Sequence, residues 1–503
     1  MSVIKIKGLD GKSYEYEDKI IGQGGMKDVY FSPDKSYVVG FFRDKQDANS
    51  KERLVAITGK YRDGIFSQIG GEYWKELFCW PTATVEHDGR LGVIAPVYHK
   101  HFFFEFGSSD NRTIDIKGKE KEGKWFASAY LFNKNLDPRE KGNWQSYIRI
   151  CILICRAVRR MHAAGLAHSD LSYKNILIDP CGGHASLIDI DGLVVPGKFP
   201  PGVVGTPDFI APEVMQTSKL PITDKNKKLP RRETDQHALA VLIYMYLLHR
   251  HPLRGRKVHD LDDTENDEFL QMGERALFIE NENDKSNSYD LKWLKNNEQH
   301  RFNDFLPWGD LNKTSYKILG PYLSELVKRA FVSGLHSPLN RPSADDWENA
   351  LVKTVDLMQP CKKCAQQWFI FDNSKSPICP FCGTKYSEPL PILNLYSCRS
   401  GGKYLPDNHR LMVYHNQYVY QWHVNRNIFP NEKLTADQRK PVGYFAFHKG
   451  KWCFVNQTLT RMKDMKENKE IPINSMVVLE NDKQLLLSPE DGGRLVHVQM
   501  VNT

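Results

Sequence analysis

Residues 168–177 read His168-Ser169-Asp170-Leu171-Ser172-Tyr173-Lys174-Asn175-Ile176-Leu177, and they follow an apolar stretch that runs from Trp144 to Met161. In this run Asp170 precedes Asn175 by five residues. An aspartate at that spacing can orient a hydroxyl group, while the asparagine amide can hold a metal ion, and the pair is typical of a phosphoryl-transfer loop. Because one short pattern can arise by chance, its weight depends on the motifs that accompany it.

The overall composition indicates a protein of more than one domain. The chain has 503 residues, of which 41% are hydrophobic and 26% are charged, as in soluble globular proteins. The formal net charge of +8 is spread along the chain without a basic tract, so nucleic acid is not expected as a partner. The longest apolar run, Ala238 to Leu248, is too short to span a bilayer. No membrane partner is therefore expected.

The cysteines and the first residues indicate the compartment. Four of the ten cysteines form two CxxC pairs and the others are scattered, which suits a reducing environment better than a disulfide framework. The run Met1-Ser2-Val3-Ile4-Lys5 starts no secretory signal. We therefore expect a cytoplasmic protein.

Hydrophobic periodicity divides the chain into four expected domains of an α+β protein. Residues 1–98 read as short strands with one helix, and residues 99–358 become mostly helical after an irregular, charged segment. Residues 359–388 form a cysteine-bearing module. Residues 389–503 show strand-like alternation, as in Gln417 to Trp422, and are expected to form an all-β sandwich.

Further motifs accompany the 168–177 run in a defined order. A glycine cluster in a strand turn lets backbone N–H groups approach phosphate oxygens, although alone it is more often only a tight turn. The motifs are Ile21-Gly22-Gln23-Gly24-Gly25-Met26-Lys27-Asp28-Val29-Tyr30, Leu187-Ile188-Asp189-Ile190-Asp191-Gly192, Gly205-Thr206-Pro207-Asp208-Phe209-Ile210-Ala211-Pro212-Glu213, Asp235 and Asn340-Arg341-Pro342-Ser343.

In this order the motifs resemble those of the eukaryotic-type (Hanks-like) protein kinases over about residues 15–355. The resemblance implies a bilobal protein-kinase-like fold with residues 1–98 as the N-lobe and 99–358 as the C-lobe. It implies that Asp170 is the catalytic base and that Asn175 and Asp189 are the magnesium ligands. It also implies that Asp235 holds the catalytic-loop backbone. Glu213 and Arg341 should form a buried ion pair, which costs about 3–5 kcal/mol to break.

Two aspartates compete for the metal role. Asp189 follows Leu187-Ile188 as in the family's Leu-Ile-Asp-Phe-Gly frame, and Asp191 then occupies the position of the glycine. Asp191-Gly192 is the alternative frame. The distance from Asn175 favours Asp189.

The main departure from the family concerns the lysine of its third strand. Gly40 occupies that position in Tyr37-Val38-Val39-Gly40-Phe41-Phe42, while Lys27 stands where the third loop glycine belongs. The glycine loop thus resembles that of the with-no-lysine kinases, in which the loop supplies the phosphate-contacting ammonium. The resemblance implies an ATP cradle made of Gly22, Gln23, Gly24, Gly25, Lys27 and Val29. Glu52 is the expected acidic partner of Lys27, with Glu76 as the alternative.

Other departures affect regulation and substrate. Ser169 replaces the arginine that in these kinases binds a phosphate group on the activation segment. Activity that does not require phosphorylation of this segment is therefore expected. Ser172 replaces the lysine that marks serine/threonine kinases, whereas Thr206 still favours that class.

The cysteine module predicts a metal site. Cys361, Cys364, Cys379 and Cys382 lie in two CxxC pairs, and four thiolates at this spacing close a tetrahedral zinc site. Four cysteines leave no open coordination position, so the zinc of this small ribbon is expected to be structural rather than catalytic.

The C-terminal segment resembles forkhead-associated phosphothreonine-binding domains in Gly450 to Thr458 and in Gly493 to Val501. Arg426, Asn427 and Asn456 are the candidate phosphate contacts, although no clear GR…SxxH pattern exists, and packing or partner docking is the alternative role. The whole arrangement resembles bacterial kinases of tellurite-resistance-type phosphorylation operons.

Together these patterns predict a protein kinase that uses ATP and Mg²⁺ (or Mn²⁺), favours serine or threonine acceptors, and carries a structural zinc. The complete GTPxxxAPE segment favours a protein over a small molecule as substrate. The alternative is a pseudokinase scaffold that acts through its ribbon and sandwich, with a phosphopeptide as one partner of the latter.

Overall fold

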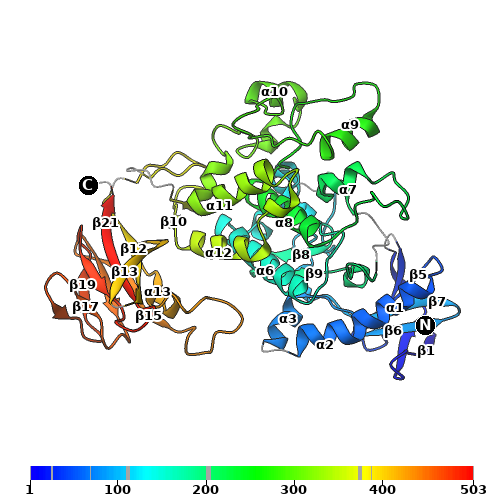
Figure 1. The fold of residues 1–503 in the computed structure, drawn as a ribbon, viewed down its shortest axis with the longest axis horizontal. Coiled ribbons are helices and arrows are strands. Elements are labelled where there is room, and N and C mark those ends of the chain that lie inside the picture. Colours follow the sequence, from blue (N-terminus) through cyan, green and yellow to red (C-terminus); the bar gives the residue numbers. More distant parts are fainter. Residues whose placement is uncertain are drawn as a thin grey trace. The chain divides into compact units, whose positions relative to one another are not determined.

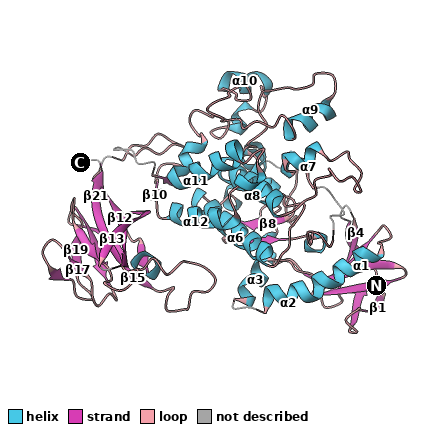
Figure 2. Cartoon of the chain, viewed as in Figure 1, coloured by secondary structure: helices cyan, strands magenta, loops and turns pink. Residues whose placement is uncertain are grey.

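The computed structural model describes residues 2–23, 26–67, 70–108, 114–199, 205–371, 377–386, 388–400 and 402–501. The backbone packs as two compact units, shown in Figures 1 and 2. The first unit comprises residues 1–142, 146–316 and 325–348, and the second comprises 143–145, 317–324 and 349–503. The cysteine-bearing segment 359–388 therefore groups with the C-terminal strands, and each unit is described by itself.

The first unit begins with a five-stranded antiparallel sheet in the order β3-β4-β5-β7-β6. Its strands are β3 (Ile20–Gln23), β4 (Lys27–Phe31), β5 (Tyr37–Phe42), β6 (Ala83–His87) and β7 (Arg90–Pro96). The sheet and the hairpin of β1 (Val3–Lys7) and β2 (Ser13–Glu17) share an apolar cluster that includes Ile6, Tyr16, Val39 and Phe41. Aromatic and β-branched side chains pack well on a pleated surface, which explains why these segments form strands.

A helical segment connects β5 to β6. It consists of α1 (Ala48–Ala56), a π-helical turn (Ile57–Tyr61), α2 (Arg62–Phe66) and α3 (Gly71–Leu77). The carboxylate of Asp47 accepts a hydrogen bond of 2.7 Å from the backbone N–H of Ser50, which caps α1. The helix therefore begins directly after Asp47.

The rest of the first unit is mostly helical. The longest helices are α6 (Trp144–Ala163), which runs from the second unit into the first, and α8 (Arg232–Leu248). From Thr234 every side chain of α8 except Gln236 is buried, as expected of a helix in the middle of a core. The antiparallel pair β8 (Ile176–Asp179) and β9 (His184–Leu187) begins at the end of the 168–177 run. The remaining helices of this unit are α4 (Lys124–Ala127), α5 (Ala129–Asn135), α7 (Pro212–Gln216), α9 (Thr264–Met272) and α10 (Leu291–Asn297). The residues of α11 (Gly320–Lys328) and α12 (Ala344–Val355) are divided between the two units.

The second unit contains two larger antiparallel sheets. One has six strands in the order β13-β12-β21-β20-β17-β18, and the other has four in the order β14-β15-β16-β19. Leu395, Val496, Phe445 and Phe454 come from both sheets and line one apolar interior, which supports the expected sandwich. The strands are β12 (Leu390–Ser400), β13 (Lys403–Met412), β14 (Tyr418–Tyr420), β15 (Pro441–His448), β16 (Lys451–Asn456), β17 (Lys463–Asp464), β18 (Lys469–Glu470), β19 (Met476–Val478), β20 (Gln484–Leu486) and β21 (Arg494–Val501).

One expected strand of this unit is shorter than predicted. The alternation from Gln417 to Trp422 suggested a single strand, but the strand ends at Tyr420 and α13 (Gln421–Val424) begins there. The backbone N–H of Tyr420 donates to Nδ1 of His423 at 3.0 Å, which stabilises the first turn of the helix. A local cap therefore overrides the period-two pattern.

No helix among the described residues combines the length and the apolar character that crossing a membrane requires.

Candidate active site

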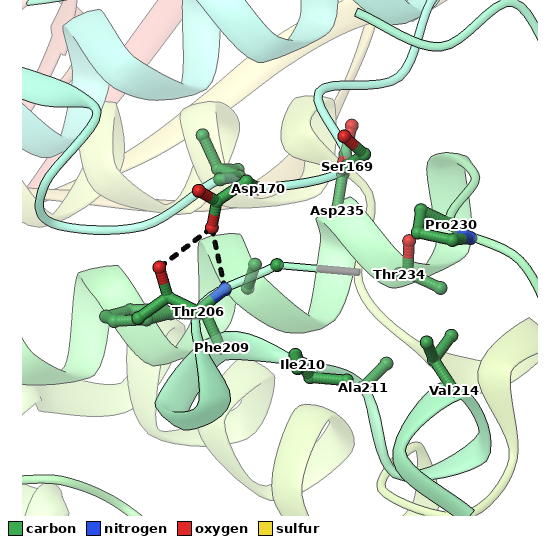
Figure 3. Close-up of a pocket in the computed structure, with 13 residues that line it drawn as sticks. Ser169, Asp170, Thr206, Phe209, Ile210, Ala211, Val214, Pro230, Thr234 and Asp235 are labelled. Carbon is green, nitrogen blue, oxygen red and sulfur yellow. Dashed lines mark hydrogen bonds between the residues drawn. The ribbon is translucent and has the colours of Figure 1, made fainter. Parts of the chain in front are cut away.

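The run 168–177 forms a loop between α6 and β8 that holds Asp170 and Asn175 against each other. The side-chain amide nitrogen of Asn175 donates to Oδ2 of Asp170 at 2.9 Å and to its backbone carbonyl at 2.8 Å. On the other side, the backbone N–H and the hydroxyl of Thr206 donate to Oδ1 of Asp170 at 2.8 and 2.9 Å (Figure 3). These hydrogen bonds therefore hold the Asp170 carboxylate in one orientation, which a group that accepts a proton requires.

Gly205 makes the approach of Thr206 possible. Its φ is +112°, a conformation that L side chains rarely adopt, and an added Cβ would lie 3.0 Å from the carbonyl oxygen of Ser169. The sequence analysis did not foresee the contact between Thr206 and Asp170, because it joins residues 36 positions apart. In the sequence, the neighbouring residues Gly205 and Thr206 are the feature that could have indicated this contact.

A buried aspartate supports the loop from α8. Oδ2 of Asp235 accepts a hydrogen bond of 2.8 Å from the backbone N–H of His168 and lies 2.9 Å from Nε2 of His162. The Asp235 side chain is buried. The structure thus agrees with the role that was expected of Asp235.

A small hollow lies beside Asp170 and is lined in part by Thr206, Ile210, Ala211 and Val214 (Figure 3). These lining residues belong to the GTPxxxAPE segment and its continuation. The segment therefore forms a surface next to the candidate base, where an acceptor group can be presented.

The ammonium group of Lys27 meets two carboxylates from the loop after β9. Nζ of Lys27 lies 2.8 and 2.7 Å from the two oxygens of Asp191 and 3.1 Å from Oδ1 of Asp189. Burial lowers the pKa of Lys27, but the two carboxylates outweigh burial and raise it well above its usual value. Burial raises the pKa of Asp189, whereas Lys27 lowers it by more, so the carboxylate is ionised.

The two aspartates differ in exposure. The side chain of Asp189 is 51% exposed, whereas that of Asp191 is 8% exposed. An exposed carboxylate can accept a further ligand, and the role of Asp189 in metal binding stays a prediction. Asp191 was considered beforehand only as the alternative metal ligand, and its contact with Lys27 was missed.

The expected acidic partner of Lys27 is wrong. Glu52 on α1 is 60% exposed and pairs with Lys198 at 3.0 Å, and Glu76 on α3 is also exposed. The physical reason is that Asp191 is already buried beside the ammonium and satisfies it with both oxygens.

The glycine loop is described in part. Gly22 and Gln23 end β3, and Val29 lies in β4, where it is paired with Gly40 of β5. Gly24 and Gly25 lie outside the described residues. The side chain of Lys27 passes over Gly40, because a Cβ added at Gly40 would lie 3.6 Å from Cδ of Lys27.

The ion pair predicted between Glu213 and Arg341 is present. Nη1 and Nη2 of Arg341 donate to the two oxygens of Glu213 at 2.8 and 2.7 Å. The guanidinium also donates to the carbonyl oxygens of Gly334, Glu233 and Leu335, so all of its N–H groups are used. The end of the GTPxxxAPE segment is thereby fixed to the core of its unit.

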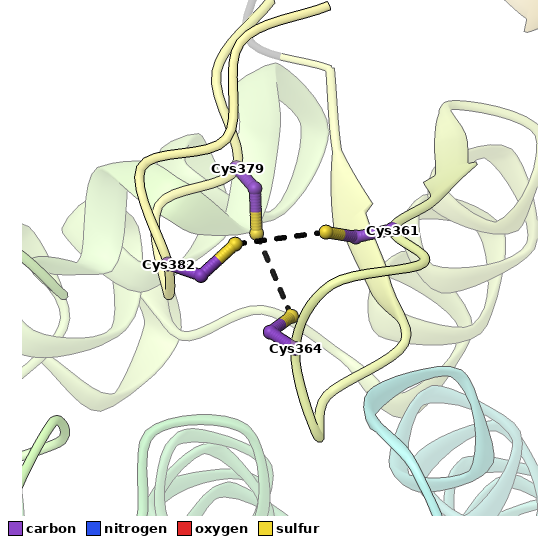
Figure 4. Close-up of side chains that lie close together, drawn as sticks. All are labelled: Cys361, Cys364, Cys379 and Cys382. Carbon is purple, nitrogen blue, oxygen red and sulfur yellow. Dashed lines mark hydrogen bonds between the residues drawn. The ribbon is translucent and has the colours of Figure 1, made fainter.

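In the second unit, the four cysteines of the CxxC pairs gather at one point (Figure 4). Their sulfur atoms all lie within 4.8 Å of one another, and the pairs Cys361–Cys382 and Cys364–Cys379 are each 3.7 Å apart. A tetrahedral zinc with bonds of about 2.3 Å holds its sulfurs about 3.8 Å apart. The cluster therefore fits a structural zinc ion.

One predicted phosphate contact in the second unit is wrong. Asn456 is fully buried, and its side chain bonds the backbone of Leu459, Ile471 and Pro472. It stabilises the turn after β16 and has no atom left for a ligand. Arg426 and Asn427 are exposed, so phosphate binding there stays a prediction.

Comparison with known proteins agrees with the geometry of the first unit. Residues 130–319 match the sequence model of the protein kinase domain. Serine/threonine-protein kinase PknD of Chlamydia pneumoniae is 25% identical over 268 residues, which cover 48% of this chain and 24% of the relative. Protein kinase C-like 2 of Schizosaccharomyces pombe is 31% identical over 115 residues, or 22% of this chain and 10% of the relative.

The chain thus spans about a quarter of the length of the PknD relatives. A rhoptry kinase structure from Toxoplasma gondii is similar to 70% of this chain over 85% of its own length, with 13% identity and a TM-score of 0.39. The family match starts at residue 130, so it does not include Lys27. The similarity to the protein kinase domain therefore extends over residues 130–319 of this chain.

Proposed function

We propose that the chain is an ATP- and magnesium-dependent protein kinase, specific for serine or threonine, whose phosphate-contacting lysine is Lys27. The contact of Lys27 with Asp189, at 3.1 Å, carries the proposal. It brings an ammonium group from the N-terminal sheet to the loop that the family uses for the metal, although Gly40 stands at the family's lysine position. The serine/threonine-protein kinases among the relatives support the acceptor class.

The residues present fit a nucleotide with its metal. Asp189 offers a half-exposed carboxylate, and both hydrogen bonds of Asn175 use its amide nitrogen, which leaves the amide oxygen for a cation. These two residues would hold magnesium, which neutralises charge on the phosphate oxygens. Lys27 and the backbone of Gly22 and Gln23 would contact the phosphates.

Asp170 would act on the acceptor. Its carboxylate, fixed by Thr206 and Asn175, would orient the acceptor hydroxyl and receive its proton. The hollow beside Asp170 supports a protein substrate, since it gives the residues around the acceptor a surface to bind. In the second unit we propose that the cysteine cluster holds one structural zinc as a small ribbon.

Transfer of label from ATP with magnesium to a generic protein substrate tests the activity. Asp170→Asn should reduce the rate by about 10²–10⁴-fold, because a general base contributes that much. A wild-type chain without transfer would favour the scaffold interpretation.

Lys27→Ala should reduce transfer by about 10²-fold or more, as expected when a charged group that stabilises the transition state is lost. Lys35→Ala is the matched control, because Lys35 is exposed in the turn between β4 and β5. An unchanged rate in Lys27→Ala would contradict the relocated lysine.

A further inference from the structure

The acidic partners of Lys27 come from one short loop rather than from a helix. Asp191 approaches Nζ with both carboxylate oxygens, at 2.8 and 2.7 Å, whereas Asp189 approaches with one oxygen at 3.1 Å. The bidentate contact is the shorter one and is also the buried one, since the Asp191 side chain is 8% exposed. Charge pairs are stronger where water is excluded.

The backbone of the loop explains why both aspartates reach the same ammonium. Asp189 has φ 59° and ψ 38°, in the left-handed region, and the single 3₁₀ turn Ile190–Gly192 follows it. Ile190 is buried between the two aspartates and anchors the turn. Aspartate adopts this region more readily than most side chains, so the sequence tolerates the sharp change of direction at Asp189.

Other acids near Lys27 are engaged elsewhere. Glu52 is the only carboxylate within α1, and it is exposed and paired with Lys198. Asp28, the neighbour of Lys27 in β4, accepts a hydrogen bond of 2.6 Å from Arg90. Asp191 is therefore the buried acid that the described structure offers to this lysine.

We propose that Asp191 is the positioning residue of Lys27, and that the loop divides its two carboxylates between two tasks. Asp191 holds the ammonium of the Lys27 side chain that passes over Gly40, while Asp189, with its half-exposed side chain, remains available to the metal. The family's glutamate on the first helix of the N-lobe is thus replaced by an aspartate two residues after the metal ligand. The proposal rests on the proposed function, in which Lys27 contacts the nucleotide.

Nucleotide and magnesium titrations of the full chain separate the two tasks. Asp191→Asn should weaken ATP binding by about tenfold to a hundredfold, the loss expected for a charge-assisted contact, with an unchanged half-saturating magnesium concentration. Asp189→Asn should instead raise the magnesium concentration required. Glu52→Gln should bind both as the wild type does.

A double-mutant cycle shows whether Asp191 acts through Lys27. In the Lys27→Met background, Asp191→Asn should change ATP affinity by less than about twofold, because its partner is already absent. The thermal midpoint of each variant reports folding. Should Asp191→Asn fail to fold, Asp191→Ser replaces it in the same cycle.

Four results would overturn the proposal. They are a raised magnesium requirement in Asp191→Asn, a loss in Glu52→Gln equal to that in Asp191→Asn, a full Asp191→Asn effect in the Lys27→Met background, and unchanged ATP affinity in Asp191→Asn. A wild-type chain that binds ATP with magnesium but transfers no phosphate would contradict the kinase activity alone. A wild-type chain that binds no nucleotide would contradict both proposals.

Discussion

At the scale of single residues, Lys27 and Gly40 depend on each other. Lys27 lies in β4 and Gly40 in the neighbouring strand β5, where a Cβ would meet Cδ of Lys27 at 3.6 Å and Val93 at 4.0 Å. The first distance is an ordinary van der Waals contact, so a methyl group fits but a larger side chain does not. The glycine at position 40 in β5 and the lysine at position 27 in β4 therefore depend on the same space, and we treat them as one change in packing.

A size series at Gly40 tests this dependence. Gly40→Ala should leave the KM for ATP within about twofold, because the added methyl group makes only ordinary contact. Gly40→Val adds branches that push the side chain of Lys27 aside, and should raise the KM about tenfold, equivalent to 1.4 kcal/mol. Initial rates measured at varied ATP concentration and saturating protein substrate give the KM of each variant. Equal KM values for the three proteins would show that Lys27 does not need this space.

At the scale of elements, the GTPxxxAPE segment depends on one buried ion pair. Both terminal nitrogens of the Arg341 guanidinium donate to the carboxylate of Glu213 in α7, and the guanidinium is buried and fully hydrogen-bonded. Arg341 follows the 3₁₀ turn Pro338–Asn340, so the pair connects the start of α7 to the chain just before α12. Losing one partner leaves an uncompensated charge in the interior.

Arg341→Met should therefore destabilise the first unit by about 3–5 kcal/mol. Lys75→Ala is the control, because the Lys75–Glu72 pair lies on the surface and such pairs contribute about 0.2–1 kcal/mol. Urea unfolding followed by tryptophan fluorescence compares the two. Similar losses of stability in both variants would contradict a special role for the buried pair.

A second buried network joins elements of the second unit. Asp356, just after α12, lies 2.5 Å from Nε2 of His409 in β13 and 3.1 Å from Nε2 of His423 in α13. Nδ1 of His423 accepts a hydrogen bond from Tyr420, so its proton is on Nε2 and faces Asp356. Burial raises the pKa of Asp356, but the two histidines outweigh burial and lower it well below its usual value.

This shift predicts loss of stability in acid. A carboxylate whose pKa is lower in the folded state stabilises fully above its unfolded pKa of about 3.9 and loses this contribution as the pH falls further. Thermal midpoints measured from pH 7 to pH 3 should therefore fall for the transition of the second unit. Asp356→Asn should start from a lower midpoint at pH 7 and show a shallower fall. Parallel curves for the two proteins would contradict the assignment.

At the scale of the whole molecule, the cysteine cluster and the active site belong to different units. The cluster closes only when Cys361 and Cys382 meet across the segment between the CxxC pairs. The sulfur atoms of all four cysteines lie within 4.8 Å of one another, which is the spacing that one metal ion requires. A bound zinc would contribute to folding of the second unit.

Metal removal should therefore affect the two units unequally. Elemental analysis is expected to find one zinc per chain in the wild type and none in Cys379→Ser. Chelation should lower the thermal transition of the second unit, while ATP affinity of the first unit stays within about twofold of wild type, since independent sites are nearly additive. A protein without zinc, or one whose transitions do not respond to chelation, would contradict the proposed ribbon.

The resemblance to the protein kinases was sufficient for one long-range contact. The pair Glu213–Arg341 agrees with expectation, because the resemblance implied it from two motifs in a fixed order. Gln421–Val424 differs, since a local hydrogen bond to His423 ends the strand.

The amino-acid sequence is enough to establish the order of the motifs, the spacing of Asp170 and Asn175, and the two CxxC pairs. The contact of Asp191 with Lys27 across 164 positions, the exposure of Glu52 and the burial of Asn456 become known from the folded chain. Burial and the choice among acidic partners depend on how distant segments close around a side chain. Hydrophobic periodicity along the chain does not predict which distant residues surround a side chain, because packing between elements determines this.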